Sequence, residues 1–190
     1  SSLCAVSLFK NRLWYVEEES MTAWYLPTLS ISGEATPFYL GGVFQRGGKL
    51  VEIDSWSFDS GNGLTSKIIF RSSAGEIAIY GGDDPDIPAD QVGAFRLESL
   101  YYVSPPVGDH GSADLGGDLI LLCRSGLVSL SSIIKGQLGM SMYENVISRN
   151  ISKTISRLAN KNQNLQSWEI MTVARSNFIM LNVPGYNNTP

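Results

Sequence analysis

Histidine and cysteine, which most often act in catalysis and metal binding, are few in this chain. The one histidine, His110, lies in a loop rich in Gly, Pro and Asp, and nothing in the sequence places a nucleophile beside it. The two cysteines, Cys4 and Cys123, are far apart and lie in apolar runs, which indicates small buried hydrophobic residues. No zinc site is expected from one His and two distant Cys. No G-x-S-x-G, Walker or dinucleotide-binding glycine pattern occurs, so we expect no enzyme activity, no metal and no cofactor.

The stretch "DDPDIPAD" places four carboxylates in one loop, at Asp83, Asp84, Asp86 and Asp90. Calcium binds oxygen ligands of this kind, but the spacing follows no known calcium-binding loop. Its two prolines are typical of a stiff turn. We therefore expect a surface loop rather than a metal site.

A second acidic stretch, "SFDSGNGL", predicts a β-hairpin. Ser57-x-Asp59-x-Gly61 matches the core of the Asp box that occurs in hairpins of sialidase-like propellers, where Asp and Ser side chains satisfy turn backbone groups. The motif occurs once, and Leu64 stands where an aromatic residue is usual. Neither an arginine cluster nor a Tyr/Glu nucleophile pair of the sialidase type can be assigned.

Length and composition bound the protein class. The chain has 190 residues, of which 43% are hydrophobic and 17% charged, and this indicates a globular domain. Its formal net charge of −4 is not that of a basic nucleic-acid-binding protein. No apolar run approaches the length of a membrane span, and no secretory signal occurs. The chain lacks an initiator Met and stops at "PGYNNTP", so we expect it to be part of a longer protein.

One phrase, a strand followed by a basic residue, a tight turn and a second strand, occurs four times. The basic residues are Lys10, Arg71, Arg124 and Arg175, at spacings of 61, 53 and 51 residues. A period near 50 is typical of four-stranded propeller blades. The predicted fold is therefore all-β, with β-propeller-like repeated antiparallel blades in an incomplete ring. We expect the four turns at equivalent places in successive blades, with each basic residue at a solvated strand end. The turns are those near Asn11, Ala74, Ser125 and Ser176.

Further strands fill the intervals between these hairpins. Apolar and polar residues alternate in 47–54 and 93–99, and 22–27 is short and aromatic. The continuous apolar run in 116–123 predicts a strand buried on both faces. The segment 177–183, "NFIMLNV", is apolar and uncharged. We expect another segment of the chain, the helix predicted at 141–160 or a neighbouring copy to cover it.

One segment, 141–160, has the periodicity of an amphipathic helix. Ser141 and Glu144 fit a capping box. An apolar face follows at intervals of three and four residues, consisting of Tyr143, Ile147, Ile151, Ile155 and Leu158. The predicted organisation is a single partial propeller domain over residues 1–190 with this helix inserted. We expect the helix to pack on its own domain, with packing on a partner as the alternative.

The phrases and their order resemble a family of phage virion proteins. The resemblance runs from about Trp14 to Pro184 and rests on "AWYLP", "ATPFYLGGVFQRGGKLVEIDSWSFDSGNG", "KIIFRSSAGEIAIYGGDDP", "GGDLILLCRSGLVSLSS", "YENVISRNIS" and "WEIMTVARSNFIMLNVP". Members are head-completion, packaged-DNA-stabilising proteins and tubular, nozzle-like tail proteins of short-tailed phages.

This resemblance implies a structural protein without catalytic or cofactor-binding residues. Such subunits form a ring at the head–tail junction or in the tail tube, retain packaged DNA and line the ejection channel. The implied partners are other copies, portal or tail proteins, and packaged DNA through non-specific channel contact, with no membrane and no small-molecule substrate. The implied location is the portal vertex or tail of the virion, after synthesis in the cytoplasm of a bacterial host. An acidic wall suits such a channel because it repels phosphates.

A carbohydrate-binding or glycosidase-type β-propeller is the alternative. It is supported by the Asp box, the acidic loop and four tryptophans that can stack on sugar rings, Trp14, Trp24, Trp56 and Trp168. Core packing is the simpler explanation of those tryptophans. A glycosidase would need a cleft with two carboxylates about 5–9 Å apart.

Overall fold

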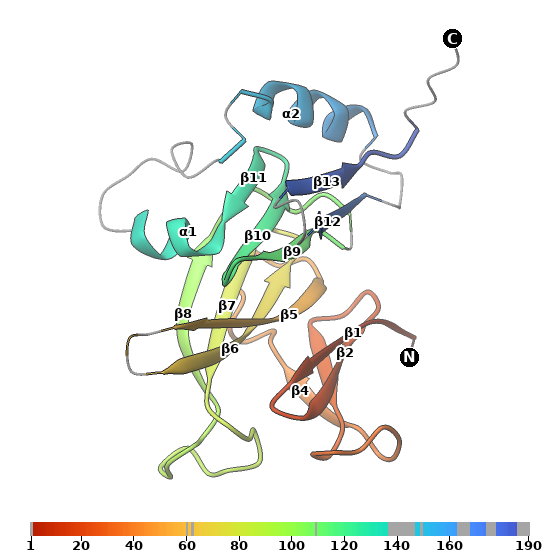
Figure 1. The fold of residues 1–190 in the computed structure, drawn as a ribbon. Helices are drawn as coiled ribbons and strands as arrows, with labels where there is room; N and C mark the ends of the chain where they lie inside the picture. The colour runs from red at the N-terminus through yellow and green to blue at the C-terminus, as the bar shows by residue number, and fades with distance from the viewer. Residues whose placement is uncertain are drawn as a thin grey trace. The chain divides into compact units, whose positions relative to one another are not determined.

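The computed structural model (Figure 1) describes residues 2–59, 61, 63–108, 110–136, 147–148, 150–162, 168–173 and 178–185. The chain divides into two compact units, Ser1–Tyr102 and Val103–Pro190. Strands in antiparallel sheets predominate, as predicted. The sheets close no ring within the described residues. A single domain over 1–190 stays a prediction.

The first unit consists of two four-stranded antiparallel sheets, each with its strands in sequence order. The first sheet contains β1 (Leu3–Phe9), β2 (Arg12–Glu17), β3 (Thr22–Tyr25) and β4 (Thr36–Tyr39). The second contains β5 (Leu50–Asp59), β6 (Leu64–Ser72), β7 (Glu76–Gly81) and β8 (Arg96–Tyr102). The predicted strands 22–27, 47–54 and 93–99 correspond to β3, β5 and β8.

An aromatic core joins these two sheets. Trp14 of β2 is fully buried. Its ring centroid lies 4.9 Å from that of Tyr25, 5.7 Å from Phe38, 5.6 Å from Phe70 and 5.4 Å from Phe95. Tyr25 and Phe38 belong to the first sheet, whereas Phe70 belongs to the second. Burial of these large rings is the main source of stability in this unit.

The four predicted hairpins form, but their places in the sheets are not equivalent. The pairs β1–β2, β6–β7, β10–β11 and β12–β13 are all antiparallel. The turn at Asn11 joins the first two strands of its sheet, whereas the turn at Ala74 joins the second and third strands. The fourth turn, 174–177, lies outside the described residues. The repeated phrase therefore marks hairpins and does not mark a fixed position within a repeated sheet.

The prediction that the repeated basic residue lies at a solvated strand end is wrong for Arg71. Its side chain is 1% exposed, and its Nη2 lies 2.7 Å from Oε2 of Glu52, which is 8% exposed. The two residues are direct cross-strand neighbours on β6 and β5. Lys10 and Arg124 lie in turns and are exposed, as predicted. A carboxylate from the neighbouring strand is what permits burial of Arg71.

The second unit combines a three-stranded sheet, a two-stranded hairpin and two helices. The sheet has the order β11-β10-β9, and the hairpin is β12–β13. The elements are β9 (Ser112–Leu115), β10 (Asp118–Cys123), β11 (Gly126–Ser129), α1 (Leu130–Gly136), α2 (Ser152–Lys161), β12 (Glu169–Val173) and β13 (Phe178–Asn182). Residues 119–123 of β10 are all buried, as their continuous apolar run predicted. Trp168 and Ile155 pack with β10 and β11 in the core of this unit.

The predicted helix is shorter than 141–160. Helix α2 begins at Ser152, whereas Ile147, Ser148 and Ile151 lie in turns before it. The N–H of Ile147 donates to the carbonyl of Leu127 at 2.9 Å, and the N–H of Leu127 donates to Oγ of Ser148 at 2.9 Å. These bonds to β11 replace the intrahelical pattern. Residues 141–146 and 149, including the proposed capping box, lie outside the described residues.

Among the described residues, β13 of the strand predicted at 177–183 is covered on one face. β13 pairs with β12, and Ile179 and Leu181 pack against the core of the second unit. Phe178 and Met180 point to the opposite face and are about half exposed, beside Met171 of β12. Coverage of this outer face by a neighbouring copy stays a prediction.

Candidate functional site

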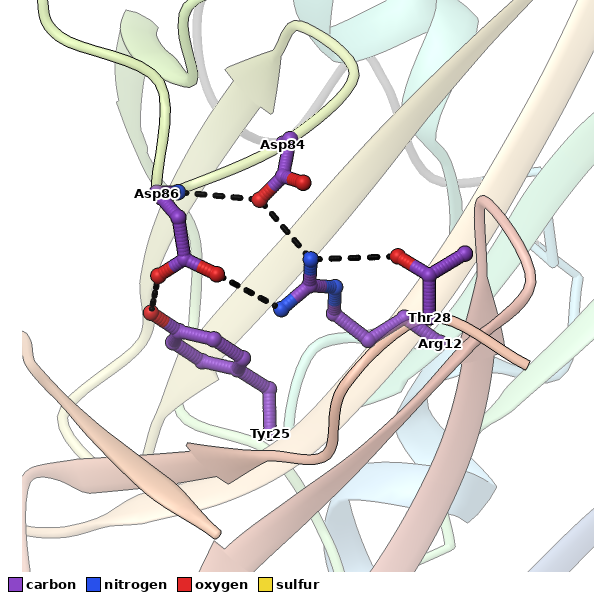
Figure 2. Close-up of polar contacts among 5 residues, drawn as sticks. All are labelled: Arg12, Tyr25, Thr28, Asp84 and Asp86. Atoms are coloured by element: carbon purple, nitrogen blue, oxygen red, sulfur yellow. Dashed lines mark hydrogen bonds and ion pairs between the residues drawn. The ribbon is translucent and has the colours of Figure 1, made fainter. Parts of the chain in front are cut away.

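A buried arginine of β2 holds the acidic loop between β7 and β8 (Figure 2). Arg12 is the first residue of β2, and its side chain is 5% exposed. Its Nη2 donates to Oδ1 of Asp84 at 2.8 Å and to Oγ1 of Thr28 at 3.2 Å. Its Nη1 donates to Oδ2 of Asp86 at 3.1 Å. Figure 2 shows the guanidinium between the two carboxylates and the Thr28 hydroxyl. One fixed cation therefore binds two carboxylates from the predicted surface loop.

Tyr25 of β3 completes this arrangement. Its hydroxyl donates to Oδ1 of Asp86 at 2.6 Å, and the Arg12 guanidinium lies over its ring, 4.9 Å from the centroid. Burial raises the pKa of Tyr25 to about 12, with a further contribution from the hydrogen bond to Asp86 and the charge of that carboxylate. The phenol therefore keeps its proton at neutral pH and acts as a donor. We call Arg12, Tyr25, Thr28, Asp84 and Asp86 the Arg12 latch.

The chemistry of the Arg12 latch favours a structural role, in which it holds the acidic loop, over a catalytic one. A tyrosine beside a carboxylate acts as nucleophile in sialidases, and that role requires the phenol to lose its proton. Here the pKa of Tyr25 moves in the opposite direction, and the acid beside it is also bound to Arg12. The latch instead ties the loop to the first sheet of its unit. Among the described residues, no group of three His, Cys, Asp or Glu side chains is placed to hold a metal ion.

The Tyr25→Phe variant is expected to be about 1.5 kcal/mol less stable than the wild type at neutral pH, because it loses a hydrogen bond to a charged acceptor. The pKa of Tyr25 is raised in the fold, so this stabilisation is complete below pH 10 and decreases as the pH rises towards 12. Urea unfolding at pH 7, 9, 10, 11 and 12 measures the difference between wild type and variant. Tyr39→Phe, at an exposed tyrosine, is the matched control and should show no difference. A difference for Tyr25→Phe that stays constant from pH 9 to 12 contradicts the assignment.

Asp83, Asp90 and the Asp-box stretch are placed as surface structure. Asp83 pairs with Lys10 at 2.9 Å between two exposed side chains, and Asp90 is exposed. Asp59 Oδ1 accepts the N–H of Gly61 at 2.8 Å, in the turn between β5 and β6. The predicted surface loop and the predicted hairpin are both confirmed.

The remaining candidates for chemistry are dispersed. His110 is exposed in a loop, as predicted. Cys123 is buried, but the prediction of a buried Cys4 is wrong. Cys4 lies in the edge strand β1, at a shift in register between Leu3 and Ala5, and is exposed. An apolar sequence run did not imply burial here because the outer face of this strand is itself apolar.

A row of apolar residues crosses the outer face of the first sheet on all four strands. Strand alternation and register place Val6, Tyr15, Trp24 and Pro37 in one row from β1 to β4. Leu8 and Leu13 form a neighbouring pair, and Tyr39 lies on the same face. Val6 is 61% exposed and Leu8 is 58% exposed. The opposite face of the sheet carries the aromatic core, so this sheet is apolar on both sides.

Three of the four tryptophans are buried. Trp14, Trp56 and Trp168 are each less than 8% exposed, which confirms core packing for them. Trp24 is half-buried on the outer face of the first sheet. Only an Arg at the start of a strand and an acidic loop more than 70 residues later could have indicated the Arg12 latch from the sequence.

Comparisons with family models, with curated proteins and with solved structures found no match to this chain. No helix among the described residues is long and apolar enough to cross a membrane.

Proposed function

We propose that this chain is a structural subunit of a phage particle, located at the head–tail junction or in the tail tube. Its copies assemble into a ring that retains packaged DNA and lines the ejection channel. The sequence resemblance suggests this role. The structural observation that supports it is the sheet β1–β4, which is apolar on both faces.

A sheet with two apolar faces belongs in the interior of a stack of sheets. Its inner face meets the sheet β5–β8 in the shared aromatic core. Two successive four-stranded meanders that pack face to face are the arrangement of neighbouring propeller blades. In this proposal the sheets are blades of an incomplete propeller, and the outer face of β1–β4 receives another apolar surface. Within the described residues β1 is an edge strand of this sheet, and edge strands can pair with a further strand.

The proposed occupant of this face is another copy of the chain. The second unit carries a different exposed apolar surface, the outer face of β12–β13 with Met171, Phe178 and Met180. Contact between two different surfaces on successive copies is heterologous, and heterologous contacts that close produce rings. Portal or tail proteins would then bind the assembled ring.

The carbohydrate alternative receives less support. Three of its four candidate tryptophans are buried and offer no open ring face to a sugar. Two carboxylates of the acidic loop, Asp84 and Asp86, form ion pairs with Arg12 and so are less available to a sugar.

The double variant Val6→Lys/Leu8→Lys is expected to abolish assembly without unfolding the chain, because both side chains already face solvent. Sedimentation velocity from 1 to 100 μM should show concentration-dependent oligomers for the wild type and a monomer for the variant. Leu29→Lys/Ile31→Lys is the matched control, since both residues are more exposed still and lie outside the sheet. This control should assemble as the wild type does.

A wild-type chain that stays monomeric throughout, or a control that fails equally, contradicts the proposed interface. The location is tested separately by an electron-microscopy map of the particle of the virus that encodes this protein. The chain should be traceable in that map as a ring at the portal vertex or in the tail.

A further inference from the structure

The basic residues of the first unit are all engaged within the fold. Residues 1–102 carry seven basic and thirteen acidic side chains, a formal net charge of −6. Five of the seven form ion pairs, one lies over an aromatic ring, and one donates to backbone carbonyls. They are Lys10, Arg12, Lys49, Lys67 and Arg71 in ion pairs, Arg46 over Tyr102, and Arg96 at the carbonyls of Ala89 and Gln91.

The second unit has the opposite electrostatic character. Residues 103–190 carry seven basic and five acidic side chains, a formal net charge of +2. Five of the basic side chains lie in its described part, at Arg124, Lys135, Lys153, Arg157 and Lys161. None of these five has a carboxylate within ion-pair distance among the described residues. Within the described part of the second unit, no carboxylate neutralises these five charges.

Three of these cations form a row on α2. Lys153, Arg157 and Lys161 recur every four residues and are exposed, whereas Ile155 and Ala159 of the same helix are buried in the core. The helix contains no acidic residue. The hydroxyl of Ser156 donates to the carbonyl of Arg124 at 2.7 Å, which holds the polar side of α2 against the β10–β11 turn.

A hollow of about 630 Å³ lies between that turn and the polar side of α2. Its lining consists of Ser125, Ser152, Lys153, Ser156, Arg157 and Asn160, and we call it the α2 hollow. Among the described residues, the lining combines two cations with hydroxyl and amide groups and includes no carboxylate. Such a set of donors suits phosphate oxygens.

We propose that the α2 hollow and the adjoining Lys161 bind the phosphate backbone of DNA without reading its sequence. This inference rests on the proposed function, in which packaged DNA is the polyanion that the subunit meets. The row from Lys153 to Lys161 is about 12 Å long at the rise of an α-helix. One strand of duplex DNA carries about three phosphates along that length. A row of cations fits a linear polyanion better than a single small anion.

The test is fluorescence anisotropy of the full 190-residue chain with a labelled 20-base-pair duplex, titrated at 50, 100, 150 and 200 mM NaCl. Three phosphate contacts predict a slope of log K against log salt of about −3. Lys153→Gln/Arg157→Gln should bring the slope to about −1 and weaken binding at least tenfold at 50 mM salt. Duplexes of different sequence should bind equally. Circular dichroism confirms that the variant is folded.

Lys49→Gln/Lys67→Gln is the matched control, because it removes the same charge from paired lysines of the first unit. Unchanged binding by this control supports the site, whereas an equal loss means that net charge alone is measured and overturns it. Absence of salt-dependent DNA binding by the wild type overturns it too. Displacement of DNA by 5 mM inorganic phosphate at constant ionic strength would indicate a small-anion site instead and also overturn it.

Sedimentation of the same samples separates this inference from the proposed function. Assembly without DNA binding would reject the α2 hollow and leave the ring proposal standing. DNA binding by a chain that never assembles would reject the ring proposal and leave the α2 hollow standing.

Discussion

Replacement of Arg12 by Met should lower the free energy of unfolding by about 2–3 kcal/mol, because it leaves two carboxylates and a hydroxyl without their shared donor. Loss of one partner from a fully buried ion pair costs more than this. Asp84 and Asp86 are 32% and 59% exposed, so water recovers part of the lost interaction. The measurement is urea unfolding of the first unit, followed by tryptophan fluorescence.

A neighbouring ion pair of the same loop provides the control. Lys10 binds Asp83 between two side chains that are both largely exposed, so Lys10→Met should change stability by no more than about 0.5 kcal/mol. Arg12→Lys should fall between the two, since one ammonium cannot span both carboxylates and Thr28 as the guanidinium does. Equal effects of Lys10→Met and Arg12→Met would show that Arg12 is only a surface charge.

Local signals predicted most hairpins and strands correctly. The turn at Asn11 has a positive φ of 57°, and Gly75 has one of 84°, as the choice of Asn and Gly at those positions indicates. The uninterrupted apolar run of β10 predicted burial on both faces. Signals of this kind lie within a few residues of each other, so the sequence carries them directly.

Pairings over long separations could not be predicted in the same way. Arg12 and Asp84 are 72 residues apart, and nothing near either residue indicates the other. The sequence therefore predicted a surface loop, and it did not indicate that Arg12 binds two of the loop's carboxylates. The start of the predicted helix was wrong for the same reason, because the N–H of Ile147 bonds to Leu127, which precedes it by 20 residues in β11. The apolar periodicity by itself predicted helix through Ile147, where the backbone instead bonds to β11.

The distribution of charge could have been found from the sequence. The excess of acid lies in residues 1–102, and α2 contains only basic charges. The net charge of −4 for the whole chain concealed this difference. An acidic wall was the expectation for a DNA channel, whereas the DNA site proposed above would lie in the basic second unit. The sequence does not show which cations form ion pairs. The proposed site depends on that information, because the ion pairs of the described residues lie in the first unit.

Arg71 gives the prediction with the largest expected effect on stability. Its guanidinium and the Glu52 carboxylate are buried together on neighbouring strands of the second sheet. Arg71→Met should lower the free energy of unfolding by about 3–5 kcal/mol, because it leaves a charged carboxylate that is only 8% exposed without its cation. Urea unfolding, followed by tryptophan fluorescence and circular dichroism, measures the loss.

The double variant Glu52→Leu/Arg71→Met decides whether the loss comes from the unpaired charge. Two apolar side chains of similar size need no counter-ion, so the double variant should return to within about 1 kcal/mol of the wild type. It also keeps the test decisive if Arg71→Met does not fold, since recovery in the double variant can then be measured alone. Failure of the double variant to recover would mean that the guanidinium stabilises the sheet through contacts other than Glu52. A loss below about 1 kcal/mol for Arg71→Met would contradict burial of the pair.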